Sequence, residues 1–326
     1  MRHADPSRRP SSTRLTLALG LILTLWSFNY IVAKQAFREM PPLAAASFRI
    51  LVAGLAMIPV FVFTLLAESR RNGGRSPGAA EAATRLASRR DLWTFAYLGF
   101  FGMIVNHLGF TVGLSYTSVS HASVIVGATP IVVLLMAWGA GLEGITKRKL
   151  AGLGLAFAGA IVLDAEHGRS AGDTGIWGDL LTLGGVVGFS LYTVLGKRVA
   201  AGYSALRMTA YNSFCAATLI LPVAVWQLVK IEHTVGLASV RWQGWAAVVY
   251  MGALSSAACF VLYFWALQSM SASKLASLNY LQPIGATLLA ALLIGEKLTV
   301  NLMVGGVLIL LGVYVIESRS GNGSSA

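Results

Sequence analysis

Ten long apolar stretches constrain this chain more than any other feature of its sequence. All but the fifth, which is short, are close to the roughly 20 residues that an α-helix needs to cross the hydrocarbon core of a bilayer. They cover residues 15–33, 43–66, 92–114, 122–142, 150–163, 176–195, 208–229, 245–267, 275–294 and 298–316. Only 12% of the 326 residues are charged, about half the share in a soluble domain. The sequence therefore predicts an all-α membrane protein with ten transmembrane helices, surrounded by the lipid bilayer.

The distribution of basic residues predicts how the chain is oriented. If the N-terminus is cytoplasmic, 18 Lys and Arg residues fall in cytoplasmic segments and six in outer segments, and Arg49 lies within a span. Cytoplasmic loops of membrane proteins are enriched in Lys and Arg. We therefore expect a multi-pass protein of the cytoplasmic membrane with both termini in the cytoplasm. The same pattern explains the net charge of +12 without nucleic-acid binding, for which the sequence has no motif.

One passage of the sequence occurs twice. "LSYTSVSHASVIVGATP" at 114–130 and "LQSMSASKLASLNYLQP" at 267–283 share an outline 153 residues apart. The same offset pairs Gly152 with Gly305 and Gly159 with Gly312. Further upstream, an offset of 163 residues aligns "WSFNYIVAK" with "GFSLYTVLGK". The longer basic loop at 68–91 in the first half explains the change of offset, so the register extends over most of the chain.

The repeat predicts two halves of opposite orientation. Each half holds five spans, and because five is odd the second half enters the membrane from the opposite side. We expect one repeat at residues 15–166 and the other at 176–317. The flanking residues 1–14 and 318–326 are predicted to be cytoplasmic tails. Many transporters use inverted repeats to build two exchangeable conformations around a site at the midplane.

The repeated segments also resemble a known family. "WSFNYIVAK", "GFTVGLSYTSVSHASVIVGATPIVVLLMAWGAGLEGIT" and "YFWALQSMSASKLASLNYLQPIGATLLAALLIGEKLT" are similar to the ten-helix EamA-like exporters of the drug/metabolite transporter superfamily. The resemblance covers about 15–316. It implies a secondary carrier that commonly exports amino acids or other small metabolites. It also implies a central cavity formed mainly by the first, third, fourth, sixth, eighth and ninth helices.

Polar residues within the spans are candidates for substrate binding. Asn29 and Tyr30 on the first span lie at the level of Tyr192 on the sixth. Thr129 and Gln282 each precede a proline in the fourth and ninth spans, where the proline removes a backbone hydrogen bond. If the halves are related by a pseudo-two-fold axis, these side chains face one another near mid-membrane. Aromatic faces with a few amides and hydroxyls suit a small amphipathic metabolite, although hydrogen bonding between helices is the alternative for each residue.

Two ionisable residues within the spans have open roles. Arg49 binds an anionic substrate group or pairs with a carboxylate such as Glu39, or else it snorkels to the outer interface or locks helix packing. His107 is the best candidate for a proton-coupling group, and a hydrogen bond between helices is its structural alternative. Whether a proton or another ion accompanies the substrate stays open.

Two glutamates occupy matching positions after the fourth and ninth spans. Glu143 and Glu296 each precede a threonine, in "EGIT" and "EKLT". We expect each carboxylate to accept hydrogen bonds from free backbone donors of the following helix. Proton coupling is the alternative role.

The sequence contains no signature of an enzyme. It has no phosphate-binding glycine loop, helical zinc motif or nucleophile elbow. We therefore predict a small-molecule substrate, no catalytic residues, and neither a cofactor nor a metal. A membrane-embedded enzyme or sensor and a channel-like protein are the alternative functions, and the sequence does not predict the oligomeric state.

Overall fold

The computed structural model describes residues 11–71, 89–116, 122, 125–164, 176–200, 203–282, 284–285, 289 and 300–317. The regular elements within these ranges are all helical. Six helices are long and apolar enough to cross a membrane: Ser12–Phe37, Pro42–Ala67, Asp91–Tyr116, Ile176–Val199, Ala205–Thr234 and Trp242–Ser269. Two shorter apolar helices cover Ile125–Gly139 and Met303–Ile316. The prediction of an all-helical membrane protein is confirmed.

The elements of the first half fall on the predicted spans, with the fourth span as the exception. They are α1 (Ser12–Phe37), α2 (Pro42–Arg71), α4 (Arg89–Gly99), the π-helix η2 (Phe100–Val105), α5 (Asn106–Tyr116), α7 (Thr129–Gly139) and α8 (Lys147–Asp164). Helices α4, η2 and α5 run on as one span. Helix α1 begins at a serine cap, because the Ser11 hydroxyl accepts a hydrogen bond from the backbone N–H of Arg14 and so satisfies one free donor of the first turn.

The described elements of the second half are helical as well. They are α9 (Ile176–Val199), α10 (Ala205–Thr234), η3 (Leu237–Ser239), α11 (Trp242–Val249), the π-helix η4 (Tyr250–Ala258), α12 (Cys259–Ser269), α13 (Ala272–Ala276), the 3₁₀ turn η5 (Ser277–Tyr280) and α15 (Val300–Glu317). Serine caps recur here, with Ser204 starting α10 and Ser271 starting α13.

The fourth and ninth spans, in which we expected a proline to interrupt the helix, are not single regular helices over the predicted ranges. Helix α7 begins at Thr129 after a turn at Ala128, and Pro130 lies in its first turn, where the missing N–H would have no helical partner anyway. In the ninth span, α13 gives way to η5 after five residues. Pro283 and Glu296 lie outside the described residues.

The two π-helices occupy corresponding positions in the two halves. The 153-residue offset carries η2 onto residues 253–258, within η4. A π turn widens the helix and is common at functional sites. Each is followed at once by a helix, α5 or α12, that contributes side chains to the cavity described below.

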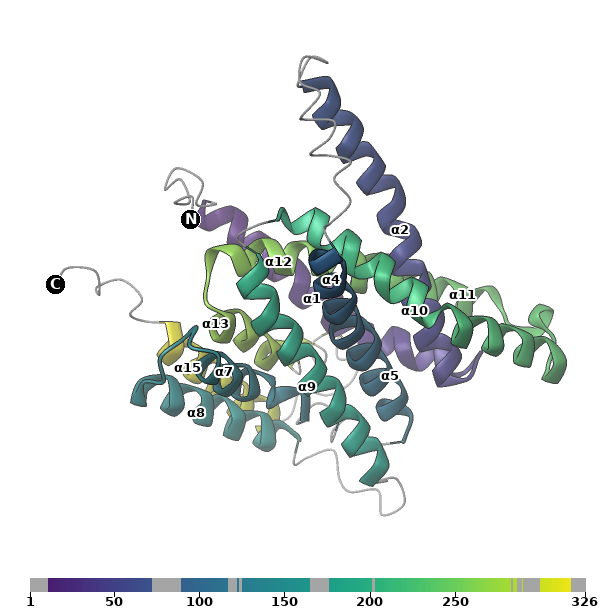
Figure 1. Cartoon of the computed structure of the whole chain (residues 1–326). Coiled ribbons are helices and arrows are strands. Elements are labelled where there is room, and N and C mark those ends of the chain that lie inside the picture. Colours follow the sequence, from purple (N-terminus) through teal and green to yellow (C-terminus); the bar gives the residue numbers. More distant parts are fainter. Residues whose placement is uncertain are drawn as a thin grey trace.

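Glycines bring α8 and α15 close together, and the two helices lie side by side in Figure 1. A Cβ atom on Gly152 would lie 2.8 Å from the carbonyl oxygen of Gly312, and one on Gly159 would lie 2.7 Å from that of Gly305. Real Cβ atoms do not approach other atoms so closely. The contacts give both helices a close-packed face, and each glycine meets the counterpart of the other.

Large apolar side chains cover much of the outer surface. Exposed examples on four different helices are Leu17, Phe63, Trp177 and Met303. A water-soluble monomer rarely exposes apolar area on this scale. The surface is suited to the hydrocarbon core of a bilayer.

Candidate functional site

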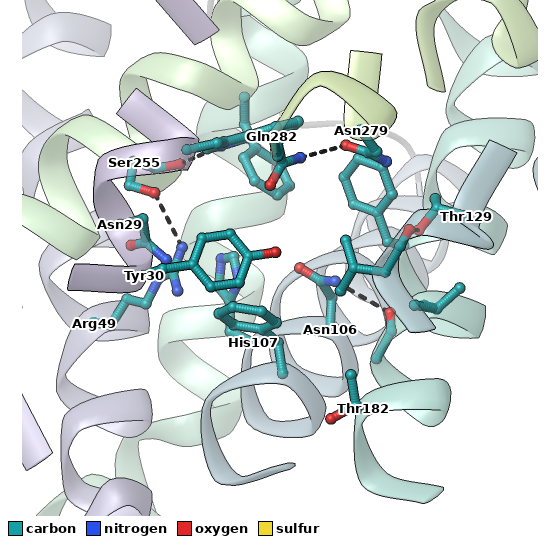
Figure 2. Close-up of a pocket in the computed structure, with 17 residues that line it drawn as sticks. Asn29, Tyr30, Arg49, Asn106, His107, Thr129, Thr182, Ser255, Asn279 and Gln282 are labelled. Atoms are coloured by element: carbon teal, nitrogen blue, oxygen red, sulfur yellow. Dashed lines mark hydrogen bonds between the residues drawn. The ribbon is translucent and has the colours of Figure 1, made fainter. Parts of the chain in front are cut away.

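A cavity of about 80 Å³, measured as the space open to the centres of water-sized molecules, lies among α1, α2, α5, α7, α9, η4, α12 and η5 (Figure 2). Residues from both halves of the chain line it: Trp26, Asn29, Tyr30, Arg49, Asn106, His107, Phe110, Val126, Thr129, Thr182, Gly185, Val186, Phe189, Ser255, Phe260, Asn279 and Gln282. The lining therefore combines aromatic rings with amide and hydroxyl groups and one guanidinium. Such a cavity can hold a small molecule with both apolar and polar parts.

The structure brings six of the seven candidate residues to this cavity. They are Asn29, Tyr30, Arg49, His107, Thr129 and Gln282. Tyr192 does not line it: the side chain is fully buried, and its ring packs against Phe260 and Phe264 at centroid distances of 5.2 and 4.9 Å. Phe189, almost one turn earlier on α9, occupies the cavity wall instead.

Several residues of the cavity lining were not among the candidates predicted from the sequence. Asn106 donates from Nδ2 to the carbonyl of Gly185 at 3.1 Å, and Asn279 accepts from Nε2 of Gln282 at 2.6 Å. The repeat offsets carry a signal that points to some of them, because corresponding positions line the cavity in both halves. The pairs are Trp26 with Phe189, His107 with Phe260, Val126 with Asn279, and Thr129 with Gln282.

Arg49 is buried at the cavity wall, with only 4% of its surface exposed. Its Nε donates to the Ser256 hydroxyl at 2.8 Å, and its Nη2 to the Ser255 hydroxyl at 3.4 Å. The snorkelling alternative and the pairing with Glu39 are therefore wrong. Glu39 instead forms a salt bridge with Arg241 at 2.5 Å. The hydrogen bonds that Arg241 donates to Glu39 hold the pKa of Glu39 below its ordinary value.

His107 lines the cavity and also connects two helices. Its Nε2 lies 3.1 Å from the Ser256 hydroxyl, so α5 is joined to η4. The ring packs edge-on against Phe260 at 5.5 Å. This is the hydrogen bond between helices that we gave as its structural alternative. In the described part of the chain, no group of three or more His, Cys, Asp and Glu residues is placed to hold a metal ion.

Aromatic side chains fill the space between the cavity and the ends of α9 and α12. This aromatic cluster consists of Trp26, Phe189, Tyr192, Phe260, Tyr263 and Phe264. Trp26 packs 5.8 Å from Phe189 and 5.7 Å from Tyr263, and the Thr193 and Tyr263 hydroxyls lie 3.0 Å apart. Three of its members, Trp26, Phe189 and Phe260, also line the cavity.

Beyond the aromatic cluster, Glu143 joins the two halves. Its carboxylate accepts a hydrogen bond from Nζ of Lys149 at 2.8 Å and from the backbone N–H of Ser273 at 3.0 Å, and the Ser273 hydroxyl also donates to it. We call these three residues the Glu143 latch. Burial raises the pKa of Glu143, but the hydrogen bonds from Lys149 and Ser273 outweigh it and hold the pKa below its ordinary value.

The prediction that Glu143 caps the following helix is wrong, because its backbone donor belongs to a different helix. Thr146 caps the following helix, since its hydroxyl accepts from the backbone N–H of Lys149 at 3.2 Å. Glu143 is therefore left to reach the first turn of α13 in the other half, where a helix start offers free N–H donors. Nearby, Nζ of Lys197 donates to the carbonyls of Leu267 and Met270 at 2.5 and 2.7 Å, so α9 is tied to the end of α12.

An apolar helical chain that surrounds a cavity lined from both halves of the sequence has the form of a membrane transporter. The family model described as the EamA-like transporter family matches the chain twice, over residues 14–163 and 176–318. The chain belongs to the EamA-like transporter family, as the sequence resemblance predicted.

Individual relatives extend over almost the whole chain. An "Uncharacterized transporter" of Archaeoglobus fulgidus is 26% identical over 95% of this chain and 98% of its own length. The protein named "Probable terminal-alkyne amino-acid exporter" of Streptantibioticus cattleyicolor is 29% identical over 74% of this chain and 78% of its own. A solved crystal structure with 20% identity superimposes with a TM-score of 0.68 over 94% of this chain and 98% of that one. That structure supports the fold alone.

Proposed function

We propose that this protein is a secondary transporter that exports small metabolites or amino acids across the cytoplasmic membrane by alternating access. The observation that carries the proposal is the cavity, to which both halves contribute side chains at corresponding positions. The relative from Streptantibioticus cattleyicolor, whose name describes an amino-acid exporter, supports the substrate range. Export from the cytoplasm rests on the family resemblance.

The proposed architecture is ten transmembrane helices in two inverted repeats, at residues 15–166 and 176–317. Three observations support it. The family model matches each half separately, the two π-helices correspond by the 153-residue offset, and the glycine contacts between α8 and α15 exchange corresponding positions. The cytoplasmic placement of both termini rests on the Lys and Arg distribution.

In this mechanism the two halves move against each other around the cavity. The aromatic cluster and the Glu143 latch are proposed to close the side of the membrane on which α9 and α12 end. The Lys and Arg distribution predicts that this side is cytoplasmic. Opening to that side requires the Glu143 carboxylate to release Ser273 and the aromatic rings to separate. Asn29, Thr129 and Gln282 are proposed to orient the polar part of the substrate, and Tyr30 and Trp26 to contact its apolar part. Tyr192 is proposed to act through the closure rather than by contact with substrate.

The proposal is tested with the purified protein in liposomes. Uptake of radiolabelled amino acids and aromatic carboxylates is measured with and without the same unlabelled solute inside. A carrier gives saturable uptake that internal solute accelerates, because exchange avoids the return of the empty cavity. Flux that rises linearly with concentration, without this acceleration, would indicate a channel. No protein-dependent flux for any solute in the set would contradict the proposal.

A further inference from the structure

Arg49 is a buried cation whose observed partners are neutral. Its two hydrogen-bond acceptors are serine hydroxyls, and among the described residues no Asp or Glu forms a salt bridge with it. The described lining of the cavity likewise contains no Asp or Glu. A charged group at membrane depth normally pairs with an opposite charge or faces a pathway. The counter-charge for Arg49 is therefore missing from this wall.

The surroundings of Arg49 hold its guanidinium in place while leaving it beside the cavity. Ser256 accepts from its Nε and also donates to the carbonyl of Met251 at 2.8 Å. The indole Nε1 of Trp26 donates to the carbonyl of Ser255 at 3.0 Å. These bonds fix the two serines on the π-helix η4. A planar guanidinium held in this way is prepared to bind a planar oxyanion through paired N–H groups.

A second side chain of the same cavity also lacks a partner. The Oδ1 atom of Asn29 is buried without a hydrogen-bond partner among the described residues. Figure 2 shows Asn29 on the same wall as Arg49 and Ser255, with Asn106, Asn279 and Thr129 across the cavity. Leaving a buried acceptor unpaired is costly unless a ligand or water satisfies it. A ligand that carries an N–H or O–H donor would satisfy Asn29.

On the proposed transport function, we propose that Arg49 is the carboxylate-binding residue of the cavity. The substrate class is an organic carboxylate with an apolar or aromatic body. Its carboxylate lies against the Arg49 guanidinium, and its body contacts the rings of Tyr30, Phe110 and Phe260. The carboxylate supplies the negative charge that this wall lacks, and the cavity discriminates against the corresponding uncharged amide.

The test measures ligand-dependent thermal stabilisation of the full-length protein in detergent. The probes are 3-phenylpropionate and L-phenylalanine, each compared with its carboxamide, and acetate as a carboxylate without a body. At least one of the two aromatic carboxylates should stabilise the wild-type protein, and its amide and acetate should bind about tenfold more weakly or worse. Equal stabilisation by acid and amide, or no stabilisation by either acid, overturns the inference.

Variants separate binding from a structural role. Arg49→Gln should abolish the preference for the acid, and Arg49→Lys should keep part of it because charge remains without the planar fork. Arg14→Gln removes an exposed charge at the start of α1 and should change nothing. In the absence of ligand, Arg49→Gln should unfold at the same or a higher temperature than wild type, because a buried charge without a counter-ion is removed.

A clear fall in the unfolding temperature of ligand-free Arg49→Gln, with the acid preference retained, would show that Arg49 only locks the helices. Liposome flux keeps the two proposals apart. Saturable exchange that is equal in wild type and Arg49→Gln would preserve the transport function and contradict the carboxylate site.

Discussion

At the scale of single residues, the cavity contains side chains that serve the fold and side chains that do not. The Trp26 indole and the Ser27 hydroxyl donate to the backbone carbonyls of Ser255 and Gln282, so both hold α1 against the second half. Asn29, on the same helix, leaves its Oδ1 unpaired within the described structure. Natural folds rarely keep such a group unless something else binds it. We therefore expect Asn29 to matter for substrate more than for stability.

The first prediction concerns Asn29. Asn29→Leu should lower liposome transport several-fold, since a lost hydrogen bond to substrate is worth about 1 kcal/mol. The amount of folded protein and its unfolding temperature should stay near wild type. Thr111→Val is the matched control, because the Thr111 hydroxyl is also buried and unpaired in the described part of the chain but does not line the cavity. Unchanged transport by Asn29→Leu at normal abundance would remove Asn29 from the site.

The sequence identified several residues of this cavity, but it could not predict in which direction every side chain points. The depth of a residue in the membrane follows from its position within a predicted span, and this depth identified Asn29, Thr129 and Gln282 as candidates. Which way a side chain points around its helix depends on packing, and this excluded Tyr192 from the lining. Ser255 was not recognisable because its backbone lies in the π-helix η4, where the wider turn changes the direction of each side chain.

At the scale of elements, the contact between α8 and α15 depends on the absence of side chains. A Cβ on Gly312 would lie 2.6 Å from the backbone nitrogen of Ala156. Gly154, on the same helix as Ala156, has no heavy atom within 4 Å of the corresponding position. Two glycines in one helix pair therefore differ sharply in how much room they have.

The second prediction follows from this difference. Gly312→Leu should reduce the amount of folded protein in the membrane, because forcing closely packed helices apart costs about 1–3 kcal/mol or more. Gly154→Leu should be tolerated, since its side chain would point into open space. Size-exclusion chromatography of the solubilised protein measures both. Equal loss of folded protein in the two variants would contradict the proposed role of the contact.

The third prediction concerns the Glu143 latch and pH. The folded-state pKa of Glu143 lies below its ordinary value of 4.5, so its stabilising contribution is present above that value and is lost as the pH falls through the folded-state pKa. Glu143→Gln should therefore lower the unfolding temperature at neutral pH. The difference from wild type should shrink on acidification below 4.5. A difference that stays constant over this pH range would show that the charge of Glu143 is not what stabilises the latch.

The Glu143 latch also contains a contact between the two halves that the sequence pattern did not predict. The 153-residue offset pairs the glycines that form the close contact between α8 and α15, but it did not predict that these two helices lie side by side. It also placed Glu143 beside a helix start, but the helix that it contacts comes from the other half and is 130 residues away in sequence. Contacts between halves depend on how the elements pack, and a pattern within one segment does not contain that information.

At the scale of the whole molecule, the fourth prediction tests orientation. Single cysteines placed within the basic segment 70–90, in a chain whose Cys215 and Cys259 are replaced by alanine, should be shielded from an impermeant thiol reagent in intact cells. They should react once the cells are opened. The basis is the 18-to-6 distribution of Lys and Arg, which favours a cytoplasmic position. Labelling from outside in intact cells would reverse the proposed topology.

Arg49 breaks the symmetry that the duplication otherwise suggests. Its counterpart by the 163-residue offset is Asn212, which is uncharged, fully buried and absent from the cavity lining. A carrier with identical halves would work equally well in both directions. With a guanidinium in one half only, half-saturating concentrations and maximal rates should differ between the two faces of the membrane. Without a coupled ion, these kinetic differences must compensate so that solute still reaches equal concentrations on both sides, and net accumulation therefore measures coupling rather than asymmetry.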